Sequence, residues 1–460
     1  MSHTSTLRTA AHGTAREPAE RFASVFHRFA RLSASGGIVL LMCAVAALIW
    51  ANSPFGSSYF GLFNQVLSVE LERPHIHLEK PLVVWINDLL MAVFFFLVGL
   101  EIKREILVGE LASVRRAALP IAAAIGGMVV PGVIYAALNW GQPTLRGWGV
   151  PVATDIAFAL GVLMLMGTRA PIGLRVFLTS LAIVDDLGAL IVIAVFYTEQ
   201  LNLEYLGLAG IPMALMIGAS IARVRAPWVY LVIGGFLWYF ILKCGVHATI
   251  AGVLSAMTIP ASPRVDTRRF VDSSRAALDH FERHGEEAER IRLNADQRAA
   301  ARVLARNCKL IESPLHRLEH ALHGWVAFFI LPLFALANAG VQLSAEGIGE
   351  LIRGKVTVGV VLGLVLGKPV GIVLASLLAV KLRIAELPSE TTWRHIIGAG
   401  CLGGIGFTMS LFIASLAFTD PAGLDAAKVG ILAGSAISGV LGLGVLLTIP
   451  RGSAQRQSRQ

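Results

Sequence analysis

Charged residues are scarce in this chain. Only 15% of its 460 residues are Asp, Glu, Lys or Arg, whereas soluble domains carry about 25%. Low charge combined with 55% apolar residues excludes an ordinary soluble enzyme, and it also excludes intrinsic disorder, which needs high charge and few apolar residues. Glycine is abundant, at 46 residues, but it has no fixed period, which excludes a collagen-like chain.

Cysteine is scarce as well, and the four cysteines form no metal or disulfide pattern. They lie far apart in the sequence, and no Cys-x-x-Cys pair occurs. No nucleotide-binding loop is present either. We therefore expect no cofactor. The net charge of +9 is better explained by basic residues that flank membrane helices than by binding to nucleic acid.

A long apolar run is missing from the first 35 residues, so no cleavable secretory signal is expected there. This stretch instead carries several arginines among Ser, Thr and Ala. The composition favours a basic arm, and a transit peptide is the alternative.

Apolar segments dominate the remainder of the chain. A transmembrane helix needs about 20 mainly apolar residues. We predict an all-α polytopic membrane protein with about twelve transmembrane helices, of which the seventh and eighth are short. The segments lie near residues 36–51, 82–100, 117–138, 150–167, 176–197, 206–221, 228–242, 246–259, 325–341, 356–380, 396–418 and 429–449.

The distribution of Lys and Arg predicts the orientation in the membrane. These residues concentrate in alternate connecting segments, beginning with the N-terminal arm, which places both termini in the cytoplasm. The expected organisation is a basic cytoplasmic arm (1–35), transmembrane helices 1–8 (36–259), a charged cytoplasmic loop (260–322), transmembrane helices 9–12 (323–449) and a cytoplasmic tail (450–460).

Four ionisable residues lie deep inside the predicted spans: Asp155, Asp185, Asp186 and Lys368. An Asp or Lys at the centre of a membrane helix costs about 2.5–3.5 kcal/mol on insertion scales. A purely structural role explains this cost poorly. We therefore expect these side chains to face one another, water or a transported ion.

The adjacent acids Asp185 and Asp186 are the sharpest of these signals. Burial disfavours the charged form of a carboxyl group, and a neighbouring negative charge disfavours it further. Such a pair favours binding either a proton or a cation, and carboxylate oxygens suit hard cations. A site that accepts one or the other is the physical basis of cation/proton exchange. A structural pair bonded to polar neighbours is the alternative.

Two predicted spans contain helix-breaking residues. Pro151, Thr154 and Asp155 interrupt the fourth, and a glycine-rich stretch at 396–410 interrupts the eleventh. Paired interruptions in two halves of a chain are typical of a transporter's midplane site between inverted repeats. We expect Asp155 to offset facing helix N-termini and Lys368 to offset facing C-termini or an aspartate. Glycines that merely allow close helix packing are the alternative.

A further charged cluster is expected at the cytoplasmic side. Histidines titrate near neutral pH, and neighbouring carboxylates tune them. The cluster is consistent either with a pH-responsive entrance or with an ordinary group of charges at the membrane interface. His247 begins the eighth span, where a helix-end histidine is the default. The cluster residues are Glu101, Lys103, Arg104, Glu105, His316, Glu319, His320 and His323.

At these residues the sequence resembles the NhaA family of bacterial Na+/H+ antiporters. The similar motifs cover nearly every predicted span in the same order. They are INDLLMAVFFFLVGLEIKRE (86–105), ATDIAFALGVL (153–163), AIVDDLGALIVIA (182–194), KCGVHATIAGV (243–253), ILPLFALANAGV (330–341), LGKPVGI (366–372) and GIGFTMSLFIASLAF (404–418).

The resemblance implies twelve helices with inverted repeats, in which the broken fourth and eleventh helices cross near the membrane middle. It implies that Asp185 and Asp186 bind Na+ or Li+ in exchange for protons, that Thr154 and Asp155 contribute at the crossing, and that Lys368 and Asp88 compensate charge or couple protons. It further implies a pH-sensing region made of Glu101, Arg104, Glu105, His247, Glu319, His320 and His323.

The resulting expectation is a secondary active transporter, not an enzyme, in a bacterial inner membrane. It would export cytoplasmic Na+ or Li+ for external protons and serve pH and sodium homeostasis. The electrogenic stoichiometry of two protons per sodium rests on the resemblance alone. Membrane lipid is an expected partner, and a homodimer is left open. The rivals are a passive cation channel and an intramembrane aspartyl protease, whose two acids would face each other across a water molecule.

Overall fold

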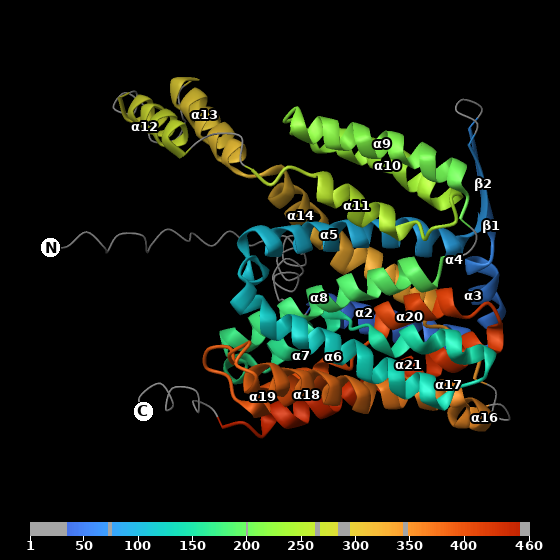
Figure 1. The fold of residues 1–460 in the computed structure, drawn as a ribbon. Coiled ribbons are helices and arrows are strands. Elements are labelled where there is room, and N and C mark those ends of the chain that lie inside the picture. Colours follow the sequence, from blue (N-terminus) through green and yellow to red (C-terminus); the bar gives the residue numbers. More distant parts are fainter. Residues whose placement is uncertain are drawn as a thin grey trace, which may run out of the picture.

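The computed structural model describes residues 35–71, 76–198, 201–262, 267–283, 295–343 and 348–450. The expected N-terminal arm and C-terminal tail therefore lie outside the described ranges, except for the residue where each adjoins the bundle. The described chain forms a bundle of roughly aligned helices with a small β-hairpin at one end (Figure 1). The all-α polytopic class expected from the sequence is confirmed.

Within the described residues, seven helical segments are long and apolar enough to cross a membrane, with mean hydropathy between 1.4 and 2.2. Three of them contain one π-helical turn each, at Ile86–Leu90, Val326–Ile330 and Gly363–Gly367. In chain order they are Leu82–Val108 (α4, Leu82–Trp85, and α5, Met91–Val108), α6 (Val114–Leu138), α8 (Ile172–Phe196), α9 (Leu203–Ile221), Pro314–Asn338 (α14, Pro314–Trp325, and α15, Leu331–Asn338), Lys355–Lys381 (α17, Lys355–Leu362, and α18, Lys368–Lys381) and α21 (Pro421–Leu447).

Three further candidate spans are pairs of helices joined at a sharp bend, and two more helices are apolar but short. Together with the seven long segments they match the twelve expected from the sequence. The bends measure 116°, 40° and 43°. The pairs are α2 (Ser35–Ala51) with α3 (Gly56–Phe63), the 3₁₀ segment Pro143–Val152 with α7 (Ile156–Leu165), and α19 (Trp393–Gly403) with α20 (Phe407–Ala417); the short helices are α10 (Pro227–Lys243) and α11 (Thr249–Thr258).

The other described elements lie near the ends of the bundle. Strands β1 (Val66–Leu71) and β2 (Ile76–Pro81) pair antiparallel, from Val66 opposite Pro81 to Leu71 opposite Ile76. They form a hairpin that hydropathy did not predict. At the opposite end, two helices project beyond the bundle (Figure 1). These are α12 (Thr267–Arg283) and α13 (Ala295–Ile311). The remaining described helices are the short α16 (Ile348–Arg353) and the 3₁₀ turns Glu110–Ala112 and Gly167–Arg169.

Several helices extend beyond the boundaries that hydropathy suggested, and two of them carry the charged cluster. Helix α5 continues to Val108, past the expected end at residue 100, and α14 begins at Pro314, before the expected boundary at 323. A hydropathy window ends at the first group of charges, whereas backbone hydrogen bonding continues wherever charged side chains can reach water. The charged cluster therefore lies on helices and not in loops.

Close backbone contact between α6 and α18 organises the centre of the bundle. A β-carbon at Gly371 would overlap the carbonyl of Gly126, and a β-carbon at Gly126 would overlap that of Gly371. Small residues at such contacts let membrane helices approach closely. The approach places the start of α18, and with it Lys368, against the middle of α6, where Gly127 lies opposite the Lys368 stem.

The helix order repeats in the two halves of the chain. A continuous helix, a broken pair and a second continuous helix occur as α6, Pro143–Val152 with α7, and α8, and again as α17–α18, α19 with α20, and α21. The first set begins with the third span and the second with the tenth, so the sets cross the membrane in opposite directions. This order agrees with inverted repeats.

Candidate ion-binding site

The two broken spans meet at their breaks. The chain is extended between Val152 and α7, and it is irregular between Gly403 and α20. The backbone N–H of Asp155 in the first break donates to the carbonyl of Ile405 in the second, with an N···O distance of 2.7 Å. Gly404 is required here because a β-carbon would overlap the carbonyl of Leu364. The crossing expected from the sequence is thus present.

Asp155 caps both half-helices that begin at the crossing. Its Oδ1 accepts from the backbone N–H of Phe158 at 2.9 Å, as the N-cap of α7. Its Oδ2 accepts from the backbone N–H of Thr408 at 3.1 Å and from the Thr408 hydroxyl at 2.5 Å. A carboxylate placed at two helix N-termini offsets the positive ends of both dipoles. Asp155 therefore lies where a carboxylate caps the starts of α7 and α20 together.

Hydroxyl groups satisfy the two helix ends on the other side of the crossing. The Thr154 hydroxyl donates to the carbonyl of Gly403, the last residue of α19, at 2.8 Å. The Ser410 hydroxyl donates to the carbonyl of Val150 at 2.7 Å. Each broken span therefore satisfies a carbonyl of the other, which fixes their relative position.

Lys368 connects this crossing to the aspartate pair. Its Nζ donates to the Thr154 hydroxyl at 2.9 Å and to Asp185 Oδ2 at 2.6 Å. Lys368 is 0% exposed and Asp185 is 1% exposed. A fully buried ion pair is retained only when its attraction and hydrogen bonds offset the loss of hydration. The lysine reaches the α19 C-terminus through Thr154 and pairs directly with one aspartate.

Asp186 lies on the next position of α8 and has no comparable partner. It is 1% exposed, and neither of its carboxylate oxygens has a hydrogen-bond partner among the described residues. Asp185 Oδ1 is likewise without one. Buried polar atoms are normally hydrogen-bonded, so three such oxygens on adjacent residues require an explanation. A bound proton or a dehydrated cation would satisfy them.

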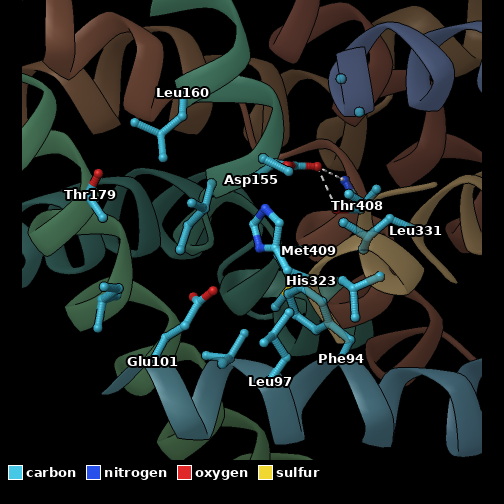
Figure 2. Close-up of a pocket in the computed structure, with 18 of the residues that line it drawn as sticks. Phe94, Leu97, Glu101, Asp155, Leu160, Thr179, His323, Leu331, Thr408 and Met409 are labelled. Atoms are coloured by element: carbon cyan, nitrogen blue, oxygen red, sulfur yellow. Dashed lines mark hydrogen bonds between the residues drawn. The ribbon is translucent and has the colours of Figure 1, made fainter. Parts of the chain in front are cut away.

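A cavity of about 480 Å³ leads toward the crossing from the end of the bundle where α5 ends and α14 begins. Asp155 and Thr408 line its inner part, and Glu101, Arg104, Glu319 and His323 line its outer part. In the view of Figure 2 the imidazole of His323 lies between the carboxylates of Glu101 and Asp155. Asp185 and Asp186 do not line it, so the aspartate pair is closed from this cavity.

Part of the expected cytoplasmic cluster is brought together around this cavity. Arg104 forms ion pairs with Glu319 of α14 and, at 3.1 Å, with Glu105. His316 Nδ1 lies 3.9 Å from Glu319 Oε2. Glu105 and His320 do not line the cavity, and His320 is exposed.

Helix phase explains which residues face the cavity. Glu319 and His323 are four residues apart and share one face of α14, whereas His320 projects about 100° away from Glu319.

Asp88 and His247 lie at the other end of the bundle, near the β-hairpin. Asp88 Oδ2 pairs with the Nζ of Lys80, on β2, at 2.6 Å, and its Oδ1 lies 3.8 Å from His247 Nε2. The His247 ring packs edge-on against Phe412 of α20, with centroids 5.1 Å apart. The structure therefore pairs Asp88 with Lys80 and separates it from Lys368, with which the sequence analysis had grouped it.

Sequence reasoning missed two residues that the structure connects to these groups: Thr408 holds Asp155, and Lys80 holds Asp88. Lys103, which the sequence placed in the cytoplasmic cluster, donates to the carbonyls of Met257 and Ile259 at the end of α11, at 2.7 and 2.5 Å. Thr154 lies just before α7 at the first break, and Thr408 lies at the start of α20 after the second break. This similar placement of two threonines in the sequence could have revealed Thr408. No sequence pattern indicated Lys80.

Comparison with known proteins now bears on this geometry. The family described as Na+/H+ antiporter 1 matches residues 27–446, which is most of the chain. The chain belongs to this family. Membership identifies an integral membrane transporter of the multi-pass type, not an enzyme, and it agrees with the resemblance seen in the sequence motifs.

Individual relatives support the same membership in the Na+/H+ antiporter 1 family. A Na(+)/H(+) antiporter NhaA from Oleidesulfovibrio alaskensis is 49% identical over 440 residues, covering 96% of this chain and 97% of the relative. One from Koribacter versatilis is 49% identical over 429 residues, covering 93% of this chain and 92% of the relative. One from an Escherichia coli strain is 46% identical over 422 residues, covering 90% and 96%.

Proposed function

We propose that the chain exchanges Na+ for H+ across the membrane as a secondary active transporter. The observation that carries the proposal is the buried pair Asp185 and Asp186 beside a crossing of broken helices. Three of their carboxylate oxygens have no hydrogen-bond partner within the described part of the chain. Carboxylate oxygens suit Na+ and Li+, which are hard cations, and the same oxygens bind protons. Because one set of oxygens serves both, the two ions compete.

The ion pair between Lys368 and Asp185 provides the coupling in this proposal. In the described structure the lysine holds Asp185 and leaves Asp186 without a partner. Na+ entering the pair takes the place of the Lys368 ammonium at Asp185 and of any proton on Asp186. One proton released from the Lys368 ammonium and one from the Asp186 carboxyl group would give the exchange of two protons for one cation that the family resemblance implies. Such an exchange moves net charge and is electrogenic.

Orientation and pathway follow from the arrangement of charge. We place both termini, the α12–α13 hairpin and the cavity in the cytoplasm, and the whole chain in a bacterial inner membrane. Cytoplasmic Na+ would enter by the cavity and reach the aspartates once the helices at the crossing shift. External protons would approach from the side of Asp88 and His247. Export of Na+ would then serve sodium and pH homeostasis.

The groups that line the cavity are the proposed pH-sensing region. Glu101, Arg104, Glu319 and His323 surround the route by which a cation approaches Asp155. Carboxyl and imidazole groups change charge with pH, so such groups alter the electrostatic potential that an approaching cation meets. Glu105 acts through Arg104, and His247 acts through Asp88 at the opposite end.

The decisive experiment uses the full chain in proteoliposomes with an imposed pH gradient. Addition of Na+ or Li+ should collapse the gradient, and an imposed Na+ gradient should move protons uphill. Asp185→Asn and Asp186→Asn should each abolish both effects. Asp425→Asn, a half-buried acid on α21, is the matched control and should retain them.

A second arm of this experiment separates exchange from its main rival. Because carboxylates must lose protons before they bind Na+, the stabilisation of the protein by Na+ should grow as pH rises and should vanish in Asp186→Asn. Na+ flux that cannot drive protons uphill would favour a passive channel instead. Normal exchange by either aspartate variant would remove the proposed site.

A further inference from the structure

The α12–α13 hairpin is not used by the proposed transport cycle. The two helices pack chiefly against each other, through Ala277 on α12 and Ala300 on α13. Asn307 of α13 donates to the hydroxyl of Ser273 at 2.9 Å, which fixes their register. The helices project beyond the end of the bundle, and in Figure 1 α13 lies on the bundle side of α12.

The face of α13 turned away from α12 is basic. Arg298, Arg302 and Arg306 follow one another at intervals of four residues, so they form one row about 12 Å long, opposite the face that contains Gln297 and Ala300. All three arginines are exposed. The residues that flank this row are mainly alanines, which leave room for the arginines to lie against a flat surface. We call Arg298, Arg302 and Arg306 the basic row.

Among the described residues of the two helices, no acid shares the face of the basic row. The acid of α13 is Asp296, which projects well away from the row at helical spacing, and the acids of α12 are Asp272, Asp279 and Glu282, of which the first two lie on the far side of α12. The outward side of α12 is therefore mixed in charge, with Arg275 and Arg283 among its basic residues. Within the described helices, the side of α13 that carries the basic row is therefore basic, and the outward side of α12 is mixed.

An apolar helix face is exposed at the edge of the bundle where the hairpin projects. Helix α9 exposes Ile211, Leu215 and Ile221, and only 17% of its most apolar window is buried, so this edge of the bundle faces the bilayer. The hairpin projects at the same edge of the bundle, with α13 on its bundle side (Figure 1). Because the basic row lies on the face of α13 opposite α12, helical spacing turns it toward the bundle. With the cytoplasmic orientation proposed above, the row faces the headgroups of the inner leaflet.

We propose that the basic row docks the hairpin on anionic phospholipid headgroups of the cytoplasmic leaflet. A row of arginines matches a surface that carries many phosphates, and guanidinium groups bind phosphate through paired hydrogen bonds. The anionic leaflet attracts each basic residue near it by an amount that falls off within a Debye length. This inference rests on the proposed orientation but not on the proposed exchange.

Docking of the hairpin would also affect a helix that lines the cytoplasmic cavity. Helix α13 ends at Ile311 and α14 begins at Pro314, where the Ser313 side chain caps the new helix. The backbone N–H of Leu315 donates to the carbonyl of Pro260, which ties the start of α14 to the end of α11. A hairpin held on the membrane thus restrains the helix that carries Glu319 and His323.

The test uses the full chain in lipid nanodiscs of phosphatidylcholine, with or without about one-third phosphatidylglycerol. A spin label is attached at Ala305→Cys, beside the basic row, with Cys43 and Cys308 changed to serine. The collision rates of the label with oxygen and with a water-soluble nickel chelate report whether the label contacts the lipid headgroup region or bulk water. In anionic discs the label should lie in the headgroup region, and high salt should transfer it to water.

Substitutions identify the surface responsible. Arg302→Gln with Arg306→Gln should lower the ratio of docked to undocked hairpin about 30-fold in anionic discs. Arg275→Gln with Arg283→Gln is the matched control on α12, with the same change of charge, and should leave the ratio near that of the parent. An equal loss in both pairs, or equal collision rates in neutral and anionic discs, overturns the proposal.

The outcome can be separated from that of the proposed function. The spin-label measurement requires no transport, and Na+-driven proton movement by the same preparations is recorded independently. Docking without exchange would contradict the proposed function alone, and exchange without docking would contradict the lipid surface alone.

Discussion

Lys368 and Asp185 form the pair on which the interior charge balance depends. Both are buried, and their 2.6 Å contact is the only ion pair with 0–1% side-chain exposure among the described residues. Removing one partner of such a pair leaves an uncompensated charge in a medium that solvates it poorly. The pair should therefore behave as a unit when it is mutated.

Lys368→Met should lower the free energy of unfolding by about 3–5 kcal/mol, because Asp185 is left without its counter-ion. Adding Asp185→Asn to that variant should restore part of this loss. Thermal unfolding in detergent measures both effects. Asp185→Asn alone gives the loss of unfolding free energy expected without coupling. If Asp185→Asn lowers the stability of the Lys368→Met variant by this same amount, the two side chains contribute independently and the pair is not a unit.

Thr408 is the residue that the geometry adds to the crossing. Thr408→Val removes the hydroxyl that donates to Asp155 while keeping the backbone donor, and it should cost about 1.5–3 kcal/mol, as expected for a hydrogen bond to a carboxylate. Thr357→Val is the control, because its buried hydroxyl donates to the neutral carbonyl of Ala426 and should cost about 0.5–1.5 kcal/mol. Equal losses of stability in the two variants, measured by thermal unfolding, would show that the hydrogen bond to Asp155 is no stronger than one to a neutral carbonyl.

At the scale of elements, the contact between α6 and α18 sets the position of the site. Gly126 and Gly371 meet backbone to backbone, and Lys368 begins the helix one turn before Gly371. A larger side chain at this contact must move α18, and with it the lysine, because the atoms it meets are main-chain atoms and not the flexible end of a side chain.

Gly371→Ala should therefore destabilise the protein by about 1–3 kcal/mol through overpacking, and it should slow exchange because the Lys368 ammonium is displaced from Asp185. Gly218→Ala on α9 is the matched change, since nothing lies within 4 Å of its added β-carbon, and the better helix propensity of alanine should leave stability equal or slightly higher. A loss at both positions would point to backbone flexibility and not to packing.

At the scale of the whole molecule, the two ends of the bundle differ in charge and in architecture. The α12–α13 hairpin and the charged cavity lie at one end, and the β-hairpin lies at the other (Figure 1). We expect the end that is richer in Lys and Arg to lie in the cytoplasm, which would set the direction in which the chain inserts. The proposed direction of Na+ export depends on that orientation.

Cysteine labelling in intact cells checks the orientation. Cys308 on α13 is exposed, so a membrane-impermeant maleimide should label it in everted vesicles and leave it unlabelled in cells. Cys308→Ser combined with Ser57→Cys, an exposed position on α3 at the other end, should give the reverse pattern. Labelling of Cys308 from outside the cell would invert the proposed topology.

Much of this architecture can be derived from sequence, because its causes are local. Hydropathy locates membrane spans because the free energies of transferring individual residues into lipid are largely additive, and it located the twelve segments here. Buried acids identify a site because their cost on an isolated helix is high. Asp185, Asp186 and the breaks at Asp155 and Gly404 were evident for these reasons, although the exposed position of His320 and the true start of α14 were not.

Only the tertiary structure decided which of these groups meet. Lys368 could have paired with either aspartate, and its contact with Asp185 and Thr154 depends on how α18 approaches α6 and on where the broken helices cross. The partnership of Asp155 with Thr408 joins residues 253 positions apart, and that of Asp88 with Lys80 needs a β-hairpin that hydropathy does not detect. Such pairings are set by the packing of whole helices, which no local pattern of residues contains.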